Sequence, residues 1–155
     1  MSEPSPRRAT IADAIALNAL ARAAYAIYLP IIGREPQPMA TDWQTLFASQ
    51  EIWIVDGPSG PLASLALEVE PDHVVIWSVA VSPAYQRKGL GRRLMEFAEA
   101  RSRDLKRPEI RLFTNAKMIR NIALYQSLGY AETRREELPD RVIVHMSKRL
   151  DIASD

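Results

Sequence analysis

The strongest constraint on the fold is a strand with two apolar faces that leads through a glycine-containing turn into a helix. The run from His73 to Val81 has the β-branched and aromatic composition of a strand, and both of its faces are apolar. A strand of this kind is usually covered on both sides by other elements. After the turn, residues 90–103 carry apolar side chains at helical spacing, namely Leu90, Leu94, Phe97 and Ala98. The two segments predict a sheet that packs against helices.

The rest of the chain predicts one domain of the α+β (mixed α/β) class. A capping box at Thr10–Asp13 predicts a helix to about residue 28. Ile15, Leu20, Ala24 and Ile27 would share its apolar face. Residues 29–40 contain three prolines and a glycine and predict a loop. The other expected elements are a short helix capped by Thr41–Gln44 and ending near 47, strands at 51–55, 62–69, 109–113, from 130 and at 141–148, and a helix at 121–128. We expect residues 7–150 to form the domain, with 1–6 and 151–155 as a disordered lead-in and tail.

Composition excludes several classes of protein. The 155 residues are 47% hydrophobic and 25% charged, which is ordinary for a globular domain and excludes disordered and fibrous chains. The net charge of +1 gives no support for nucleic-acid binding. The chain has no cysteine, which excludes thiolate chemistry, and its two histidines are too few for a histidine-rich metal site. No apolar run approaches the ~20 residues that span a bilayer and no signal peptide is expected, so we predict a cytoplasmic protein without a membrane partner.

The segment Gln86-Arg87-Lys88-Gly89-Leu90-Gly91 predicts an anion site. Glycines in such a loop allow unusual backbone angles and the close approach of a ligand. The first N–H groups of a helix have no partner within it, and together with the helix dipole they attract anions. Residues 87–107 carry eight basic side chains against three acidic ones. The segment is neither a P-loop nor a three-glycine dinucleotide motif. The alternative is a solvated helix face behind an ordinary turn.

The wider segment, residues 78–94, resembles the acyl-CoA motif of the GNAT superfamily of N-acetyltransferases. Residues 121–130 are similar to that family's Asn-x-x-Ala-x-x-Tyr-x-x-x-Gly-aromatic pattern, with the alanine shifted by one position. The resemblance covers residues 7–149, nearly the whole chain. It implies a central mixed, mainly antiparallel sheet splayed into a V and flanked by about four helices. Acetyl-CoA would lie in the opening of the V, and no metal is implied.

The resemblance also implies a role for individual residues. Main-chain groups of Val79, Ala80 and Val81 would hold the pantetheine arm of acetyl-CoA, which Asn121 would also contact. The pyrophosphate would be held by the amides of Gln86, Arg87, Lys88, Gly89, Leu90, Gly91 and Arg92. Tyr125 matches the family tyrosine that protonates the departing sulfur, and the ordinary tyrosine pKa of ~10 suits a proton donor at neutral pH. Helical spacing alone favours a packing role for Tyr125.

The general base stays open at the level of sequence. Many members of the family carry an acidic residue on the fourth strand, where this chain has Trp77. We take Glu68 as the first candidate, with Glu70, His73 or ordered water as alternatives. The two glutamates would reach the cleft directly or through water, or they are simply solvated carboxylates at the end of a strand. His145 is expected to face a neighbouring element.

We therefore predict an acyltransferase that moves an acetyl group from acetyl-CoA to a primary amine by direct attack in a ternary complex. Tyr28 and Trp77 would line the acceptor pocket, together with Tyr25 and residues 29–40. The acceptor is a small-molecule or peptide amine, and we expect no nucleic-acid partner. A homodimer and the identity of the amine are left open. The alternative function is a non-catalytic acyl-CoA-binding sensor on the same fold.

Overall fold

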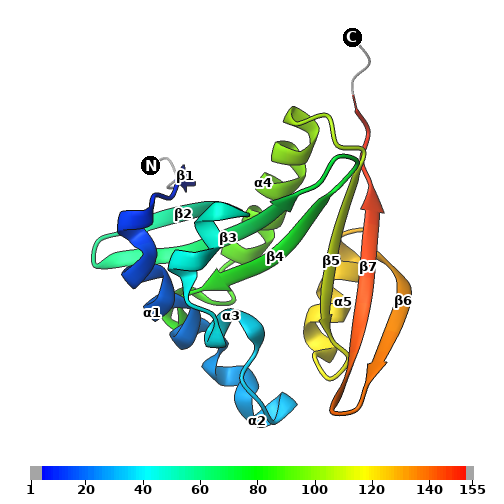
Figure 1. The fold of residues 1–155 in the computed structure, drawn as a ribbon, viewed down its shortest axis with the longest axis horizontal. Coiled ribbons are helices and arrows are strands. Elements are labelled where there is room, and N and C mark those ends of the chain that lie inside the picture. Colours follow the sequence, from blue (N-terminus) through cyan, green and yellow to red (C-terminus); the bar gives the residue numbers. More distant parts are fainter. Residues whose placement is uncertain (1–4, 153–155) are drawn as a thin grey trace.

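A computed structural model describes residues 5–152, which fold around a seven-stranded sheet of order β1-β2-β3-β4-β5-β7-β6 (Figure 1). The strands are β1 (Arg7–Arg8), β2 (Glu51–Gly57), β3 (Gly60–Val69), β4 (Val74–Val81), β5 (Glu109–Asn115), β6 (Ala131–Leu138) and β7 (Arg141–Arg149). The α-helices are α1 (Ala14–Tyr25), α2 (Leu29–Ile32), α3 (Gln37–Ala40), α4 (Leu90–Asp104) and α5 (Ile119–Ser127). Short 3-10 turns occupy Ile11–Asp13, Ala26–Tyr28, Trp43–Ala48 and Pro83–Tyr85.

The sheet splits between β4 and β5 into two wings. These two strands are parallel and pair only from Val74 opposite Ile110 to Ile76 opposite Leu112. A bulge follows at once, because β3 pairs with Ile76 and then with Ser78 and leaves Trp77 without a partner. A bulge bends its strand and increases the local twist. Beyond it β4 and β5 diverge, as Figure 1 shows, and the predicted V-shaped, mainly antiparallel sheet is confirmed.

Helices cover both faces of the wing that contains β2, β3 and β4. Helix α4 packs on one face through Leu94 and Ala98, which join the larger core cluster with Leu65 and Ile76. Helix α1 packs on the other face (Figure 1). Alternate residues of β4 are fully buried. The prediction that this strand is covered on both sides is therefore confirmed.

The N-terminal third differs from the sequence expectation in its details. The Thr10–Asp13 capping box forms, with the Thr10 amide donating to Asp13 Oδ2 at 2.8 Å, but it opens a 3-10 turn before α1 begins. The second cap is Asp42, whose side chain accepts from the Gln44 amide at 3.1 Å, rather than Thr41. The predicted loop at 29–40 contains the short helices α2 and α3, each with a proline in its first turn, where the missing N–H costs nothing.

The predicted apolar face of α1 is confirmed for Leu20 and Ala24 and is wrong for Ile15 and Ile27. The buried face consists of Ala14, Leu17, Leu20, Ala21 and Ala24. Ile15 is 84% exposed, and Ile27 lies beyond the helix and is exposed. The small side chains of Ala21 and Ala24 pack against Ala66 and Ala80 of the sheet. Interiors are close-packed, so this alanine contact leaves no room for a bulky isoleucine.

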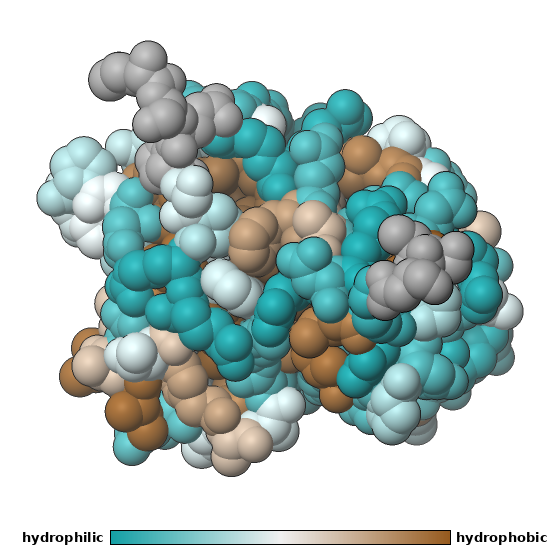
Figure 2. Space-filling view, turned by 90° about the horizontal axis from the view of Figure 1, so that it is seen from above, coloured by the Kyte–Doolittle hydropathy of each residue, from teal (hydrophilic) through white to brown (hydrophobic). Residues whose placement is uncertain are grey.

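The helical stretch Ile11–Ile32 has 22 residues and is long and apolar enough to cross a membrane by length and composition alone, with a mean hydropathy of 1.6 over an 18-residue window. Asp13, Asn18 and Arg22 interrupt its apolar runs, so the expectation from run length did not single it out. Buried core helices of water-soluble proteins meet the same criterion, and the inner side of α1 packs on the sheet. Figure 2 shows that the end of the molecule seen from above is mainly hydrophilic, with apolar side chains between the polar ones and at the left edge.

The two ends of the domain are only partly described. Residues 1–4 and 153–155, which belong to the predicted lead-in and tail, lie outside the described residues. At the N-terminal end, Arg7 and Arg8 pair with Ile54 and Trp53 of β2 and form a strand that the sequence did not predict. At the C-terminal end, Ile152 packs against the larger core cluster.

Candidate active site

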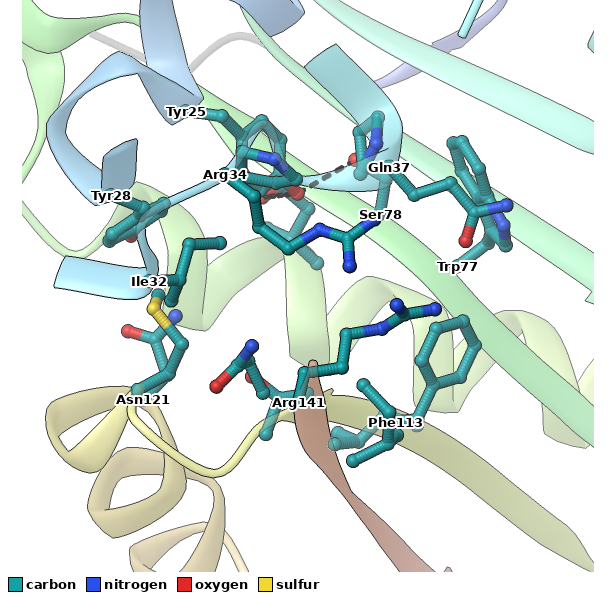
Figure 3. Close-up of a pocket in the computed structure, with 18 of the residues that line it drawn as sticks. Tyr25, Tyr28, Ile32, Arg34, Gln37, Trp77, Ser78, Phe113, Asn121 and Arg141 are labelled. Carbon is teal, nitrogen blue, oxygen red and sulfur yellow. Dashed lines mark hydrogen bonds between the residues drawn. The ribbon is translucent and has the colours of Figure 1, made fainter. Parts of the chain in front are cut away.

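A cleft of about 650 Å³ opens where β4 and β5 diverge. One wall is formed by residues 76–79 of β4 and the opposite wall by residues 112–115 of β5. The segment from α1 to α3 contributes Tyr25, Tyr28 and Arg34, while α5 contributes Asn121 and Tyr125. The β6–β7 hairpin closes the remaining side. Figure 3 shows side chains from these elements pointing into the common space.

Tyr125 lies on α5 with its ring among the core residues and lines the cleft. Its ring packs edge-on against Tyr130 at a centroid distance of 6.3 Å. Within residues 5–152 its hydroxyl makes no hydrogen bond. Burial raises the pKa of this phenol, and the nearby Tyr25 and Tyr28 hydroxyls raise it further. Tyr125 therefore stays protonated at neutral pH and presents a free O–H donor to the cleft.

Tyr25 anchors β4 directly after the bulge. Its hydroxyl lies 2.9 Å from Ser78 Oγ and donates to the carbonyl of Val79 at 3.0 Å (Figure 3). Burial raises the pKa of Tyr25 to about 12, so the phenol keeps its proton. We infer that Tyr25 holds the strand edge that lines the cleft. The sequence indicated only that Tyr25 belongs to a pocket wall, because the bulge that turns Ser78 toward it depends on strand pairing.

The loop before α4 has the geometry of an anion-binding nest. Arg87 and Gly89 both adopt positive φ, at 64° and 82°. Among the described residues, the backbone N–H groups of Arg87, Lys88 and Gly89 form no backbone hydrogen bond. Gln86 braces the loop by donating from Nε2 to the carbonyl of Val81 at 3.0 Å. Successive N–H groups in this conformation form a concavity for anions.

Gly89 and Gly91 have different roles in this loop, whereas the sequence pattern predicted the same role for both, which is to allow unusual backbone angles. Gly89 needs its positive φ, whereas Gly91 lies within α4 in ordinary helical conformation. A Cβ at Gly91 would meet only Val81 Cγ2, at 3.9 Å, which is ordinary contact. Backbone freedom therefore explains Gly89 but not Gly91.

These features fit acetyl-CoA. The nest at residues 86–92 presents N–H groups and basic side chains of the kind that bind a pyrophosphate. The open edge of β4 after Ile76 leaves main-chain groups of Val79 and Val81 without a neighbouring strand on the β5 side, whereas those of Ala80 point toward Ser64 of β3. Of the residues predicted to hold the pantetheine arm, Val79 and Asn121 line the cleft. The carbonyls of Val79 and Val81 already accept from Tyr25 and Gln86, each with one lone pair left.

The predicted bases lie outside the cleft lining. Glu68 is not part of that lining and accepts a hydrogen bond from Gln50 Nε2 at 3.2 Å. His73 is bound to Asp72 at 2.6 Å in the β3–β4 turn, and Glu70 lies at the start of the same turn. None of these three side chains lines the cleft, and the β3–β4 turn lies where β4 and β5 are still paired. Their role as the general base, directly or through water, stays a prediction.

Tyr28 and Trp77, the predicted acceptor-pocket residues, both line the cleft. Trp77 also packs edge-on against the buried Trp43 at a centroid distance of 5.8 Å. Tyr28 packs edge-on against Tyr25 at the same distance. The Trp77 ring thus lies between the core and the cleft, whereas Tyr28 packs on another residue of the cleft lining.

Strand β7 supplies cleft residues that the sequence did not single out as site residues. Arg141, Ile143 and His145 alternate along it and all line the cleft. His145 Nε2 lies 3.2 Å from Glu136 Oε1 of the neighbouring β6. The alternation on residues 141–148 is visible in the sequence, but which face borders the cleft depends on β7 pairing with β5. Within residues 5–152 no group of three or more His, Asp or Glu side chains could hold a metal ion.

Comparison with known proteins agrees with this geometry. Residues 17–130, more than half of the chain, match the Acetyltransferase (GNAT) family. The chain belongs to this family. The predicted family is confirmed.

Several relatives show how far the similarity extends. An [Ribosomal protein bS18]-alanine N-acetyltransferase of Escherichia coli K12 is 37% identical over 86 residues, which are 52% of this chain and 57% of the relative. The chain thus spans little more than half the length of the curated relatives it matches. The crystal structure of the ribosomal-protein-S18-alanine N-acetyltransferase of E. coli has a TM-score of 0.78 at 20% identity, covering 97% of this chain and 96% of that one.

Two further solved structures of the same fold contain the coenzyme. The PaiA N-acetyltransferase of Thermoplasma acidophilum, in complex with coenzyme A, has a TM-score of 0.76 at 16% identity over 96% of this chain and 99% of that one. A putative streptothricin acetyltransferase of Bacillus anthracis, in complex with acetyl-CoA, has a TM-score of 0.61 at 20% identity over 66% of this chain and 64% of that one. At these identities the likeness concerns the fold.

Proposed function

We propose that this protein transfers the acetyl group of acetyl-CoA to a primary amine by direct attack in a ternary complex, with Tyr125 as general acid. The observation that carries the proposal is the Tyr125 hydroxyl, which lines the cleft, keeps its proton and has no partner among the described residues. A donor held in this way can hydrogen-bond a departing sulfur at the moment it becomes charged.

Each part of the reaction has candidate residues. Acetyl-CoA supplies an acetyl group activated as a thioester. Residues 86–92 would hold its pyrophosphate, and Val79 to Val81 with Asn121 its pantetheine arm. A new C–N bond replaces the C–S bond, so one proton leaves the amine nitrogen and Tyr125 delivers another to the sulfur. Because the pKa of the Tyr125 phenol is raised, the tyrosinate that results takes up a proton readily, and the enzyme returns to its starting protonation state.

His145 is the group in the cleft best placed to accept the amine proton. It is a cleft-lining side chain with a carboxylate partner, Glu136, that can orient its ring. The other charged groups that line the cleft are Arg34, Glu35 and Arg141. We expect His145→Gln to lower kcat at neutral pH. The fall in kcat should be smaller at high pH, where the amine deprotonates without a base. An unchanged pH–rate profile would remove His145 from the reaction.

Tyr125→Phe tests the proposal directly. The ring is kept, so acetyl-CoA KM should stay near the wild-type value, while kcat should fall about tenfold or more because a transition-state donor is lost. The measurement is steady-state thiol release, with a pre-steady-state experiment to confirm that chemistry limits the rate. Thermal stability is the control. An unchanged kcat in a stable variant would leave Tyr125 as a packing residue.

A thiol-release screen across amine classes separates this function from a non-catalytic sensor. Trp77, rather than a carboxylate, at the bulge of β4 is the observation that favours the sensor. Because the E. coli relatives are named for an alanine of ribosomal protein bS18, the screen includes a peptide with N-terminal alanine beside small amines. Turnover with any amine supports the enzyme, whereas acetyl-CoA binding without turnover supports the sensor. We propose that the reaction takes place in the cytoplasm.

A further inference from the structure

Two arginines from opposite sides of the cleft meet on one carboxylate. Arg34 follows α2, and Arg141 is the first residue of β7. Arg34 Nη1 binds Asp140 Oδ2, and Arg141 Nη1 binds Asp140 Oδ1 at 2.9 Å. Both arginines line the cleft, whereas Asp140 does not. In Figure 3 their guanidinium groups extend into the central space of the cleft between Ser78 and Phe113.

This cluster carries an excess of positive charge. Two guanidinium groups share one carboxylate, which leaves a net charge of +1. Each guanidinium has five N–H donors, and within residues 5–152 each uses only one of them on Asp140. The two acidic residues of the cleft lining occupy none of the remaining arginine donors, because Glu136 contacts His145 instead and Glu35 forms no ion pair with either arginine. The side chains are 41% and 33% exposed, so a ligand can reach them.

The walls beside the arginines are apolar. Trp77 and Phe113 flank the two guanidinium groups in Figure 3, and Ile143 lies two residues from Arg141 on the same face of β7. A cleft with convergent cationic donors and apolar walls suits a ligand that carries an anionic group on a hydrophobic body. The planar guanidinium group can donate two parallel hydrogen bonds to the two oxygens of a carboxylate.

We propose that Arg34 and Arg141 bind a carboxylate of the acceptor, so that the acceptor is an amine that carries a carboxylate and an apolar body, of the class of the apolar α-amino acids. The inference rests on the proposed function and narrows its acceptor. Asp140 is a positioning residue, because it fixes both guanidinium groups from outside the cleft. An uncharged alkylamine or a carboxamide of the same shape leaves the arginine donors unpaired and is the poorer substrate.

Matched acid and amide pairs test the inference by turnover. L-Leucine, L-methionine and L-phenylalanine are compared with their carboxamides at saturating acetyl-CoA, with thiol release as the measurement and pH chosen so that both amines are deprotonated to the same extent. We expect kcat/KM for an acid to exceed that for its amide about tenfold or more. Arg141→Gln and Arg34→Gln should remove this preference mainly through KM for the acid. Equal rates for acid and amide in the wild-type protein would overturn the inference.

Arg149→Gln is the matched control, because Arg149 lies on the same strand as Arg141, is exposed and is not part of the cleft lining. It should keep the acid preference. If Arg141→Gln lowered kcat/KM equally for the acid and the amide, Arg141 would have a structural role only, and the inference would be overturned. Acetyl-CoA binding and the thermal midpoint are measured for every variant, so that misfolding is recognised.

A binding experiment separates this inference from the proposed function. N-acetyl-L-leucine and N-acetyl-L-leucinamide are titrated into the protein with coenzyme A present, and the heat of binding or the intrinsic tryptophan fluorescence is followed. If the acid binds more tightly than the amide and Arg141→Gln removes this difference, the arginine site is supported. This holds even if no amine is turned over, and then only the proposed acetyl transfer fails. Equal binding of acid and amide overturns the arginine site even if other amines are acetylated.

Discussion

At the scale of single residues, substitutions of Gly89 and Gly91 in the loop before α4 distinguish effects on coenzyme binding from effects on folding stability. Gly89 adopts φ 82° with open space around its Cα, so a side chain there meets no atom but strains the backbone. Gly91 has room for a Cβ in ordinary helical geometry. A substitution should therefore lower stability at Gly89 and leave it nearly unchanged at Gly91, although both positions belong to the proposed pyrophosphate site.

We expect Gly91→Asp to keep the thermal midpoint of the wild-type protein and to lose acetyl-CoA affinity by about tenfold or more. An acidic side chain in the first turn of a helix is favourable toward the helix dipole, but it repels a phosphate at the same place. Gly91→Ala is the uncharged control and should bind acetyl-CoA better than Gly91→Asp. Calorimetry measures both quantities. Wild-type affinity in a folded Gly91→Asp protein would mean that the pyrophosphate lies elsewhere.

Gly89→Ala should instead cost about 1–2 kcal/mol of folding stability, because a left-handed conformation is unfavourable for a residue with a Cβ. In a chain of this size that corresponds to a fall of the thermal midpoint by about 2–4 °C for each kcal/mol. Differential scanning calorimetry of the two alanine variants is the measurement. A midpoint for Gly89→Ala as high as that for Gly91→Ala would contradict the backbone argument.

At the scale of elements, a buried carboxylate joins β2 to α4. Glu51 on β2 accepts from Arg101 Nε and Nη2 on α4 at 2.6 and 3.1 Å, and from Trp53 Nε1 at 2.8 Å. Burial alone would raise the pKa of this carboxyl, but the hydrogen bonds from Arg101 and Trp53 outweigh it and hold the pKa below the usual range. A carboxyl whose pKa is lowered on folding stabilises the folded state at neutral pH and loses that contribution as the pH falls.

We therefore expect Glu51→Gln to destabilise the protein at pH 7 by about 1–3 kcal/mol, because the remaining amide cannot match a carboxylate toward Arg101. The difference from wild type should shrink as the pH falls below about 4, where the wild-type carboxyl also becomes neutral. Urea titrations at a series of pH values measure both effects. A difference that is the same at pH 7 and at acid pH would show that the charge of Glu51 is not what links the two elements.

At the scale of the whole molecule, the two wings of the sheet are tied together behind the cleft. Lys148 of β7 donates from Nζ to Glu99 of α4 at 2.9 Å and to the carbonyl of Leu128 at 2.8 Å. Tyr130, the second residue after Leu128, donates to the other oxygen of Glu99 at 3.1 Å. Glu99 is 8% exposed, so its charge depends on these partners. The network connects α4, which packs on one wing, with β7 and the end of α5 on the other.

Replacing Lys148 by Met should lower the thermal midpoint by several degrees, since a buried carboxylate without its cation costs about 1–3 kcal/mol. Lys117→Met is the control, because Lys117 is exposed and forms no side-chain ion pair among the described residues. Glu99→Gln combined with Lys148→Met should recover part of the loss, because the unpaired charge is then gone. No recovery in the double variant would mean that packing of the lysine stem, and not its charge, joins the wings.

The local chemistry of this protein could be predicted from its sequence. The glycine loop, the helix behind it, the apolar strand before it and the left-handed Gly129 after α5 each depend on residues within a few positions of one another. Such features are governed by backbone sterics, capping and periodicity, which act over one or two turns. Tyr125 and Asn121 could be named as site residues only because residues 121–130 resemble the family pattern, since helical spacing alone favours a packing role for Tyr125.

What the tertiary structure alone decided is which side chains share the cleft. The pairing of β3 with β4 produces the bulge at Trp77, and that bulge brings Tyr25 to Ser78 across 53 residues of sequence. The pairing of β7 with β5 turns Arg141 and His145 inward, whereas Glu68 lies on the side that faces Gln50. Strand register is set by contacts between distant segments, and a shift of one residue exchanges the two faces of a strand. Local periodicity therefore shows that two faces exist, and only long-range pairing decides which of them the substrate meets.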